Sequence, residues 1–353
     1  MLTRNRGQVL LIFLAGLLGL LGITALGVDV GYMYTARHEL QRCTDAGALA
    51  GASAFIHGSW SDPGVRALAD SRARAFAAKD KVATSTLAPA SEVSVAFPAA
   101  ERVRVQASRT VPLFFSRLFL GPTRTITATS VAEASAVGSN VKGLKPWGIP
   151  YPWEDTDGDG LFDAGETVHR DCPDGVPDPS RYFCPGTRVI LKIGTPKGSS
   201  KNPNNGIPST QQESGHTIVN GSQTAYSVGD AITLEPGNMV GPTRQGTNEL
   251  IDADPQSAWN NEKNLPESSQ YHANDGSWMN SPRVIRIPIY DPEAALTNGR
   301  TDMVVAAFGG FWIESIGNQG TVYGRYIPLQ AFGAGPLQGP SSGPVLKVLR
   351  LVE

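Results

Sequence analysis

An uninterrupted apolar segment near the N-terminus constrains this chain more than any other feature. Residues 8–28, QVLLIFLAGLLGLLGITALGV, contain no charged side chain. An α-helix rises about 1.5 Å per residue, so this segment is long enough to cross the hydrocarbon core of a bilayer. We therefore predict a transmembrane helix at 8–28 and expect the lipid bilayer to be a partner of this protein.

Two arginines precede the span and predict its orientation. Arg4 and Arg6 lie in the segment 1–7, and positively charged flanks stay in the cytoplasm. We predict a single-pass protein of the inner (cytoplasmic) membrane whose bulk is periplasmic or extracellular. A cleaved signal peptide and a buried core helix are the alternatives. The span exceeds the apolar region of a signal peptide, which is about 7–15 residues, and no A-x-A-like site closes it.

The helix is expected to continue beyond the membrane. Residues 29–57 contain no proline and many small residues, among them the stretch AGALAGASA. Small residues let helices approach closely. This helix extension packs either on its own domain or on other copies of the chain, as in a filament, and the sequence leaves both open.

Residues 4–57 and part of 90–135 resemble a known family. The Arg-Gly before the span, the Val-Asp-Val-Gly at its end and the run ELQRCTDAGALAGA resemble the N-terminal segment of TadE/TadG-like proteins of the Tad (tight-adherence) pilus machinery. Residues 103–134, VRVQASRTVPLFFSRLFLGPTRTITATSVAEA, resemble the strand, short amphipathic helix and strand of the same family. The resemblance implies a structural or assembly role, with other pilus or secretion-apparatus subunits and other copies of the chain as partners.

The sequence also departs from that family. Prepilin-type processing after Gly7 expects Glu at the fifth mature position, where this chain has Ile12. TadG-like proteins often carry a von Willebrand factor A domain with a D-x-S-x-S metal motif, which this chain lacks. The resemblance therefore does not carry processing at Gly7 or that metal site over to this protein.

We predict a small pilin-like α+β unit over residues 58–139. Asp62 and Pro63 are typical of a helix start, and we expect a helix over 62–82. Apolar and polar residues alternate in SEVSVAF, ERVRVQASRTV and TRTITATSVAEASA, which predicts three half-buried strands.

We predict a mainly β module over residues 140–353. Gly, Pro and Asn separate short apolar runs there, and such runs between turn signals indicate strands. The polar stretch 196–215 is expected to be a long mobile loop. The Gly pair in FGGFWIESIG hints at a bulge or a close backbone contact. The strands are expected at 188–194, 224–234, 282–292, 302–317 and 321–329.

The twelve residues DTDGDGLFDAGE, at 155–166, match the EF-hand loop pattern. Calcium takes about 6–8 oxygen ligands, and this spacing wraps oxygens around one point, with a glycine at the sharp turn. We predict Ca²⁺ as a cofactor, and an acidic surface turn that binds nothing is the alternative. The predicted ligands are the side chains of Asp155, Asp157, Asp159, Asp163 and Glu166 and the backbone carbonyl of Leu161.

The flanks of this loop do not predict an EF-hand. Pro146, Pro150 and Pro152 exclude a long entering helix, and the following residues are rich in turn signals. A calcium sensor works by moving two helices. We therefore expect the metal to be a structural staple, as in the helix-poor calcium loops of extracellular repeat modules that this loop resembles.

The cysteines fit an oxidising compartment. Cys172 and Cys184 flank a turn-rich segment, and we predict a disulfide between them that stabilises it by roughly 3 kcal/mol. Cys43 remains, either as a buried small residue or as a cross-link between subunits. His169 beside the two other cysteines suggests zinc, but the spacing matches no ordinary finger.

The sequence offers little catalytic chemistry. It contains no H-E-x-x-H, no G-x-S-x-G, no Walker loop and no dinucleotide glycine fingerprint. The charge is nearly balanced, with 30 basic and 32 acidic residues, and no basic patch indicates nucleic acid. The tryptophans could stack on sugars but are more often core residues. We expect a protein that is not an enzyme and does not bind nucleic acid.

Together these features predict a membrane-anchored α+β protein with five segments: a cytoplasmic tail, a transmembrane helix, a helix extension, a pilin-like unit and a calcium-stapled β module. The expected function is a structural or assembly component, similar to a minor pilin, of a Tad-type pilus or related secretion apparatus. The alternatives are a calcium-dependent cell-surface adhesin or ligand-binding protein and an envelope hydrolase. The segments are 1–7, 8–28, 29–57, 58–139 and 140–353.

Overall fold

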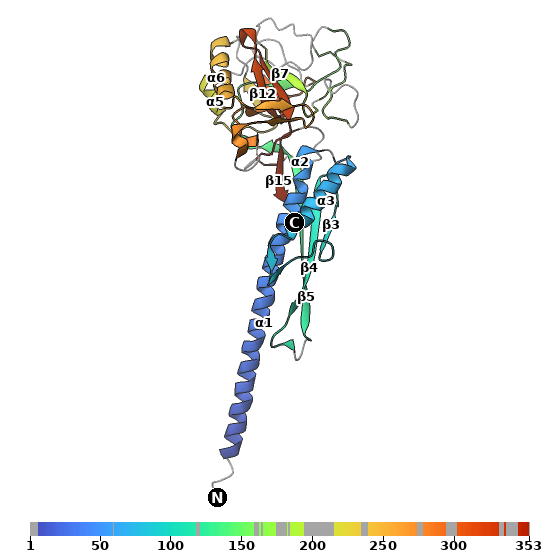
Figure 1. Ribbon diagram of the computed structural model, residues 1–353, viewed down its shortest axis with the longest axis vertical. Coiled ribbons are helices and arrows are strands. Elements are labelled where there is room, and N and C mark those ends of the chain that lie inside the picture. The colour runs from blue at the N-terminus through green and yellow to red at the C-terminus, as the bar shows by residue number, and fades with distance from the viewer. Residues whose placement is uncertain are drawn as a thin grey trace. The chain divides into compact units, whose positions relative to one another are not determined.

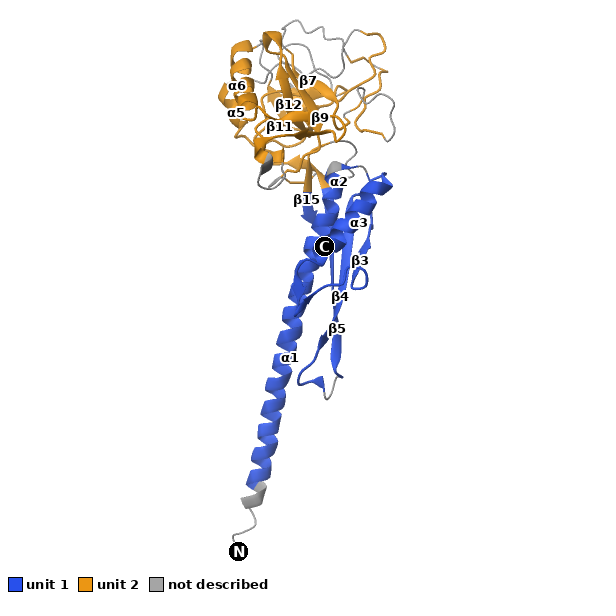
Figure 2. Ribbon diagram, in the orientation of Figure 1, with its two compact units in different colours: residues 1–134, 349–353 blue, residues 135–348 orange. Residues whose placement is uncertain are grey.

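The chain forms two compact units, unit 1 at 1–134 with 349–353 and unit 2 at 135–348 (Figure 2). Each has its own hydrophobic core. The computed structural model describes residues 6–58, 60–117, 121–158, 162–163, 165–173, 182, 184–193, 215–233, 239–273, 278–293, 302–331, 335–336 and 345–352.

The longest element of unit 1 is helix α1, Arg6–Ala52, which is followed by the single turn α2, Ala54–His57 (Figure 1). The helix continues past the apolar run as the sequence predicts. It is long and apolar enough to cross a membrane, and no residue of its most apolar stretch is buried. That stretch is therefore not a core helix of the described fold. The second half of α1 has a buried face that includes Ala36, Leu40 and Ala48.

Helix α3, Pro63–Ala77, packs against this second half of α1. The Asp62 carboxylate caps its start by accepting a hydrogen bond of 2.7 Å from the backbone N–H of Gly64. A methyl group on Gly47 of α1 would lie 2.8 Å from the carbonyl oxygen of Ala73 in α3. Small residues in the second half of α1 therefore pack within their own unit, which is the first of the two possibilities left open by the sequence.

Helix α3 ends five residues before the predicted end at 82. The chain turns there into a two-stranded hairpin, β1 (Lys81–Val82) and β2 (Ser85–Thr86). Pairing of these strands and burial of Val82 in the core outweigh the helical pattern of the preceding residues.

The sheet of unit 1 is antiparallel, in the order β3–β4–β5. Strand β3 is Val93–Ala96, β4 is Arg102–Pro112 and β5 is Thr123–Ser139. Alternate residues of β4, including Val103 and Val105, are buried, so one face of the strand meets the helices. The end of β5 also pairs with the short β14, Gly335–Pro336, and β15, Lys347–Leu351, pairs with β5 as well.

Unit 2 is built on a six-stranded sheet in the order β6–β11–β12–β13–β7, with β8 paired to β12. Neighbouring strands are antiparallel except β6, which runs parallel to β11. Large side chains such as Trp147, Phe311 and Tyr326 fill its core. The bounds are β6 Ile149–Pro150, β7 Arg188–Lys192, β8 Ala231–Thr233, β11 Val284–Tyr290, β12 Asp302–Ile316 and β13 Val322–Ile327.

The Gly pair of β12 marks a close backbone contact, as its sequence suggests. A methyl group on Gly310 would lie 2.8 Å from the carbonyl oxygen of Ile327 in β13 and 2.6 Å from the Cβ of Leu329. Most of the polar stretch 196–215, predicted to be a mobile loop, lies outside the described residues.

Unit 2 also contains two helices that the sequence does not predict, α5 (Gly215–Asn220) and α6 (Val240–Asp252). A methyl group on Gly246 of α6 would lie 2.7 Å from the Cβ of Ile218, so glycine permits their close approach. The remaining elements are β9 Ala258–Asn260, β10 Leu265–Glu267 and the 3₁₀ turns η2 Gln270–Ala273, η3 Trp278–Asn280 and η4 Asn318–Gly320.

Candidate functional site

The acidic loop 155–166 leaves the sheet of unit 2 directly after β6. Its two ends meet in a short antiparallel bridge between Trp153 and Val168. The N–H of Glu154 donates to the Thr167 carbonyl at 2.9 Å. Because β6 is hydrogen-bonded to β11, this bridge lies next to the edge of the six-stranded sheet.

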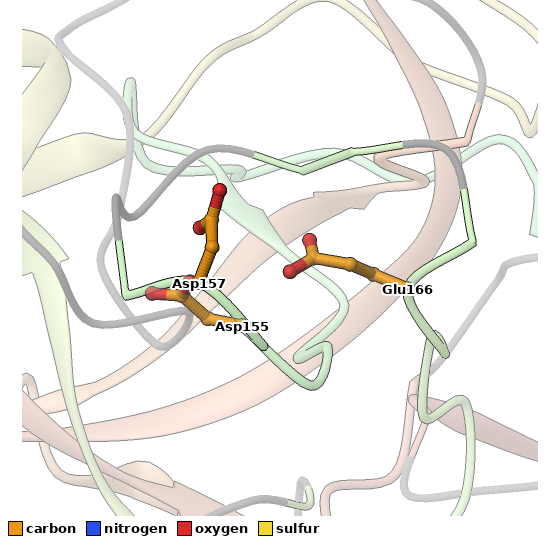
Figure 3. Close-up of side chains that lie close together, drawn as sticks. All are labelled: Asp155, Asp157 and Glu166. Carbon is orange, nitrogen blue, oxygen red and sulfur yellow. The ribbon is translucent and has the colours of Figure 1, made fainter.

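Three acidic side chains of the loop come together (Figure 3). Asp155, Asp157 and Glu166 can each offer one carboxylate oxygen such that these oxygens lie within 4.8 Å of one another. Glu166 is buried, Asp155 is half-buried and Asp157 is exposed. Three negative charges at this separation repel one another, and a bound cation would offset that repulsion.

Backbone groups of the loop hold the carboxylates in place. Glu166 Oε1 accepts from the N–H of Thr156 at 2.7 Å, and Glu166 Oε2 accepts from the N–H of Asp163 at 3.0 Å. Asp155 Oδ1 accepts from the N–H of Gly158 at 2.7 Å. Gly158 has φ of +76°, a left-handed conformation that glycine adopts without strain. The glutamate that ends the motif therefore points into the loop.

The described residues include only part of the predicted ligand set. Asp159, Gly160 and Leu161 lie outside them. Asp163 is among the described residues, and its backbone N–H donates to Glu166. The ring of Phe162 lies 6.1 Å from that of Trp153, edge to face, and it packs against the core. No helix enters or leaves the loop in the described flanks, which agrees with the prolines that precede it.

The structure has the predicted disulfide between Cys172 and Cys184, whose Cα atoms are 5.0 Å apart. It joins the segment after the acidic loop to the residues before β7. Arg170 adds an ion pair of 2.8 Å to Asp291, which follows β11. The disulfide uses both thiols, so the zinc alternative with His169 loses the thiolates it requires.

Several other residues with possible chemistry belong to the described cores and surfaces. Cys43 is buried in unit 1, which agrees with its reading as a small core residue. Trp147 and Trp312 are also buried, so neither offers an open face for a sugar. His216 lies exposed in α5, where its backbone carbonyl accepts from the Asn220 side chain.

A second arrangement, at the end of the apolar run, was not identified from the sequence. Asp29 of α1 is fully buried, although it follows the span directly. Its Oδ1 accepts from the N–H of Phe114 at 2.9 Å and its Oδ2 from the N–H of Phe115 at 3.0 Å. The backbone N–H and the hydroxyl of Ser116 also donate to Oδ2. The only sequence signal is an acidic residue placed immediately after an apolar span.

The sequence of unit 1 matches the models of two known protein families. Residues 7–54 match the TadE/G-like Flp pilus-assembly family, and residues 36–132 match the Tad-like Flp pilus-assembly family. The N-terminal region of this chain is therefore similar to these two families over residues 7–132. No curated protein and no solved structure matches the chain.

Both matches fall on unit 1. The first covers nearly all of α1, and the second runs from the middle of α1 through the helices and most of the sheet to residue 132 in β5. Both families are described as Flp pilus-assembly families. The resemblance seen in the sequence is therefore confirmed for this region.

Proposed function

We propose that this protein is a single-pass envelope protein that acts as a minor pilin-like structural or assembly component of a Tad-type pilus or related secretion apparatus. The observation that carries the proposal is the match of α1 and its packed sheet to two pilus-assembly families. Other pilus or secretion-apparatus subunits, together with further copies of the chain, are its proposed partners.

The exposed apolar half of α1 supports the membrane part of the proposal. Side chains such as Val9, Phe13 and Ile23 are each about two-thirds exposed or more in the free chain, at 67%, 65% and 76%. Such a surface is stable in lipid, where the helix satisfies its own backbone hydrogen bonds. With Arg4 and Arg6 on the cytoplasmic side, both folded units lie outside the cytoplasm.

The acidic loop supports calcium as a structural cofactor of unit 2. Asp155, Asp157 and Glu166 converge, and backbone N–H groups donate to the carboxylates of Asp155 and Glu166. Hard oxygen ligands of this kind suit Ca²⁺. The metal would stabilise a segment that has no core of its own, between the sheet edge and the disulfide. With the orientation proposed for α1, this calcium-stapled module lies on the extracytoplasmic side of the membrane.

The calcium proposal is tested by thermal unfolding of the full chain in detergent, with calcium or with a chelator. Calcium at about 100 times its Kd stabilises by about 2.7 kcal/mol, so the unfolding temperature of unit 2 should rise by roughly 5–10 °C. The double variant Asp155→Ala, Glu166→Ala should lose this response. Asp171→Asn, an exposed acid outside the loop, is the matched control and should keep it.

Because Glu166 also accepts hydrogen bonds from the loop, its removal destabilises the protein even without metal. The decisive quantity is therefore the difference between calcium and chelator within each variant. Coincident curves for the wild-type chain would show that no stabilising calcium binds.

The assembly role is tested by purifying the full chain from detergent-solubilised membranes of its host and identifying the proteins that accompany it. Pilus or secretion-apparatus subunits should co-purify with the wild-type chain. If they do so with and without chelator, calcium serves only the fold of unit 2. Absence of all such subunits from a preparation of intact chain would contradict the assembly role and favour the adhesin.

A further inference from the structure

Two aromatic side chains are exposed at one end of the sheet of unit 1. Phe114 and Phe115 follow β4, and they are 51% and 56% exposed. The preceding Leu113 is 3% exposed, so the apolar side chains turn from the core to the surface between residues 113 and 114. We call Phe114 and Phe115 the aromatic tip.

Hydrogen bonds hold the aromatic tip next to Asp29 of α1. Asp29 accepts hydrogen bonds from the backbone N–H groups of Phe114, Phe115 and Ser116, and the carboxylate is fully buried. Hydrogen bonds to a charged acceptor are stronger than neutral ones, and a buried carboxylate needs its donors. This contact joins the tip to the first residue after the apolar run 8–28.

A contact between two aromatic rings places the tip at the same position along α1. The ring of Phe114 lies 5.2 Å from that of Tyr32, in an edge-to-face arrangement. Tyr32 is three residues after Asp29, which is about one helical turn. Both contacts therefore place the tip within about one helical turn of the end of the proposed membrane span.

The surface of α1 is apolar and exposed up to this level. Leu26, Val28 and Val30 are each about half exposed. Arg117, which follows the tip, is exposed as well. A continuous apolar surface that ends at aromatic rings and a cation is typical of the membrane–water interface, where aromatic and long basic side chains are enriched.

We propose that Phe114 and Phe115 insert into the extracytoplasmic interface of the bilayer that α1 crosses, as a second membrane contact of unit 1. The proposal rests on the proposed membrane span of α1. A lipid surface explains why the exposed rings occur at the height where the span ends. With α1 and the tip both held in the membrane, unit 1 cannot rotate freely about the axis of its helix.

The experiment uses the full chain, reconstituted into vesicles of phosphatidylethanolamine and phosphatidylglycerol, with a polarity-sensitive fluorophore on single introduced cysteines. Phe115→Cys reports on the tip. Ala100→Cys, exposed at the opposite end of β4, is the matched control, and Leu17→Cys reports on the span. Brominated acyl chains serve as the lipid quencher and iodide as the aqueous one. The wild-type chain measures background labelling of the buried Cys43.

We expect brominated lipid to quench most of the emission at positions 17 and 115 and little at position 100. Quenching at 17 without quenching at 115 overturns the tip contact and leaves the membrane span intact. Loss of quenching at 17 removes the span and the inference together. Quenching at all three positions also contradicts the proposal, because the whole unit would then lie on the bilayer.

A protein partner gives a different result. If position 115 is shielded from iodide but not quenched by lipid, the tip is covered by protein, such as a second copy, and the proposal is wrong. Phe114→Cys supplies a second reporter on the same tip if the Phe115→Cys chain does not fold. Circular dichroism of each labelled chain establishes that it is folded.

Discussion

At the scale of single residues, Lys145 shows how the fold of unit 2 changes the chemistry of a side chain. It is buried, and its Nζ donates to the Val219 carbonyl at 2.8 Å. Burial, and to a smaller degree the charge of Arg286, lower its pKa from the ordinary 10.5 to about 8. The charged form of Lys145 therefore costs unit 2 stability at neutral pH.

This shift predicts a pH dependence. Between about pH 8 and the unfolded value of 10.5, the unfolded chain binds more protons at Lys145 than the folded chain, so the free energy of unfolding rises with pH. The full gain amounts to roughly 3 kcal/mol. Lys145→Met should be more stable than wild type at pH 7, and its advantage should shrink towards pH 10.5. Unfolding temperatures of both chains across this range test it, and a constant difference would contradict it.

The acids of the loop are a second residue-scale case. The spacing of Asp155, Asp157 and Glu166 identified the segment, because ligand positions are fixed in sequence by the loop itself. The hydrogen bonds from Thr156 and Asp163 to Glu166 could not be predicted, since they depend on the backbone path of the folded loop.

At the scale of elements, the connection between β4 and β5 is held by a residue far away in sequence. Asp29→Ala removes the acceptor of three backbone N–H groups and one hydroxyl. Amides 114–116 should then exchange hydrogen much faster in the reconstituted chain, because their opening would no longer break charged hydrogen bonds. Mass spectrometry of the exchanged peptides measures this change.

The strand amides of β4 are the internal control for this variant. They pair with β5 and should keep their protection. Loss of protection throughout the sheet would indicate general unfolding, and unchanged exchange at 114–116 would show that Asp29 does not hold the connection.

Helix α6 illustrates an element that local sequence rules miss. Gly241, Pro242 and Gly246 are turn signals by composition. The helix forms because Pro242 lies in its first turn, where it is tolerated, and Gly246 meets Ile218 at close range. Contact with α5 therefore outweighs a weak intrinsic preference.

At the scale of the whole molecule, the C-terminal residues 349–353 belong to unit 1. Arg350 contacts the buried carboxylate of Glu133, with Nε 2.7 Å from Oε1, and the N–H of Val352 donates to the Val131 carbonyl at 2.9 Å. Glu133 also pairs with Arg102 across the sheet. The last residues thus complete the core and the ion-pair network of the first unit.

Removing residues 349–353 should therefore destabilise unit 1, although these residues are more than 200 positions away from the rest of the unit in sequence. We expect a loss of about 2 kcal/mol, since a buried carboxylate loses one of its partners and Leu349 leaves the core. Protease susceptibility of unit 1 in the full-length and shortened chains measures the effect. Arg350→Ala, which keeps Leu349, should show a smaller loss, and equal resistance of all chains would contradict the prediction.

The sequence by itself determined the features whose cause is local. The apolar span, the cap at Asp62, the alternating strands of unit 1 and the acidic loop all follow from residues close together in the chain. The TadE/G-like resemblance belongs to the same class, because each of the two segments that carry it is a continuous stretch of the chain.

Only the tertiary structure decided which distant residues meet. In the fold, Asp29 accepts hydrogen bonds from residues 114–116, and α5 and α6 make close contact at Gly246. Arg350 forms an ion pair with Glu133. These contacts join residues separated by tens to hundreds of positions, and their energy comes from burial and hydrogen bonding that exist only once the chain is folded. No local pattern in the sequence encodes them.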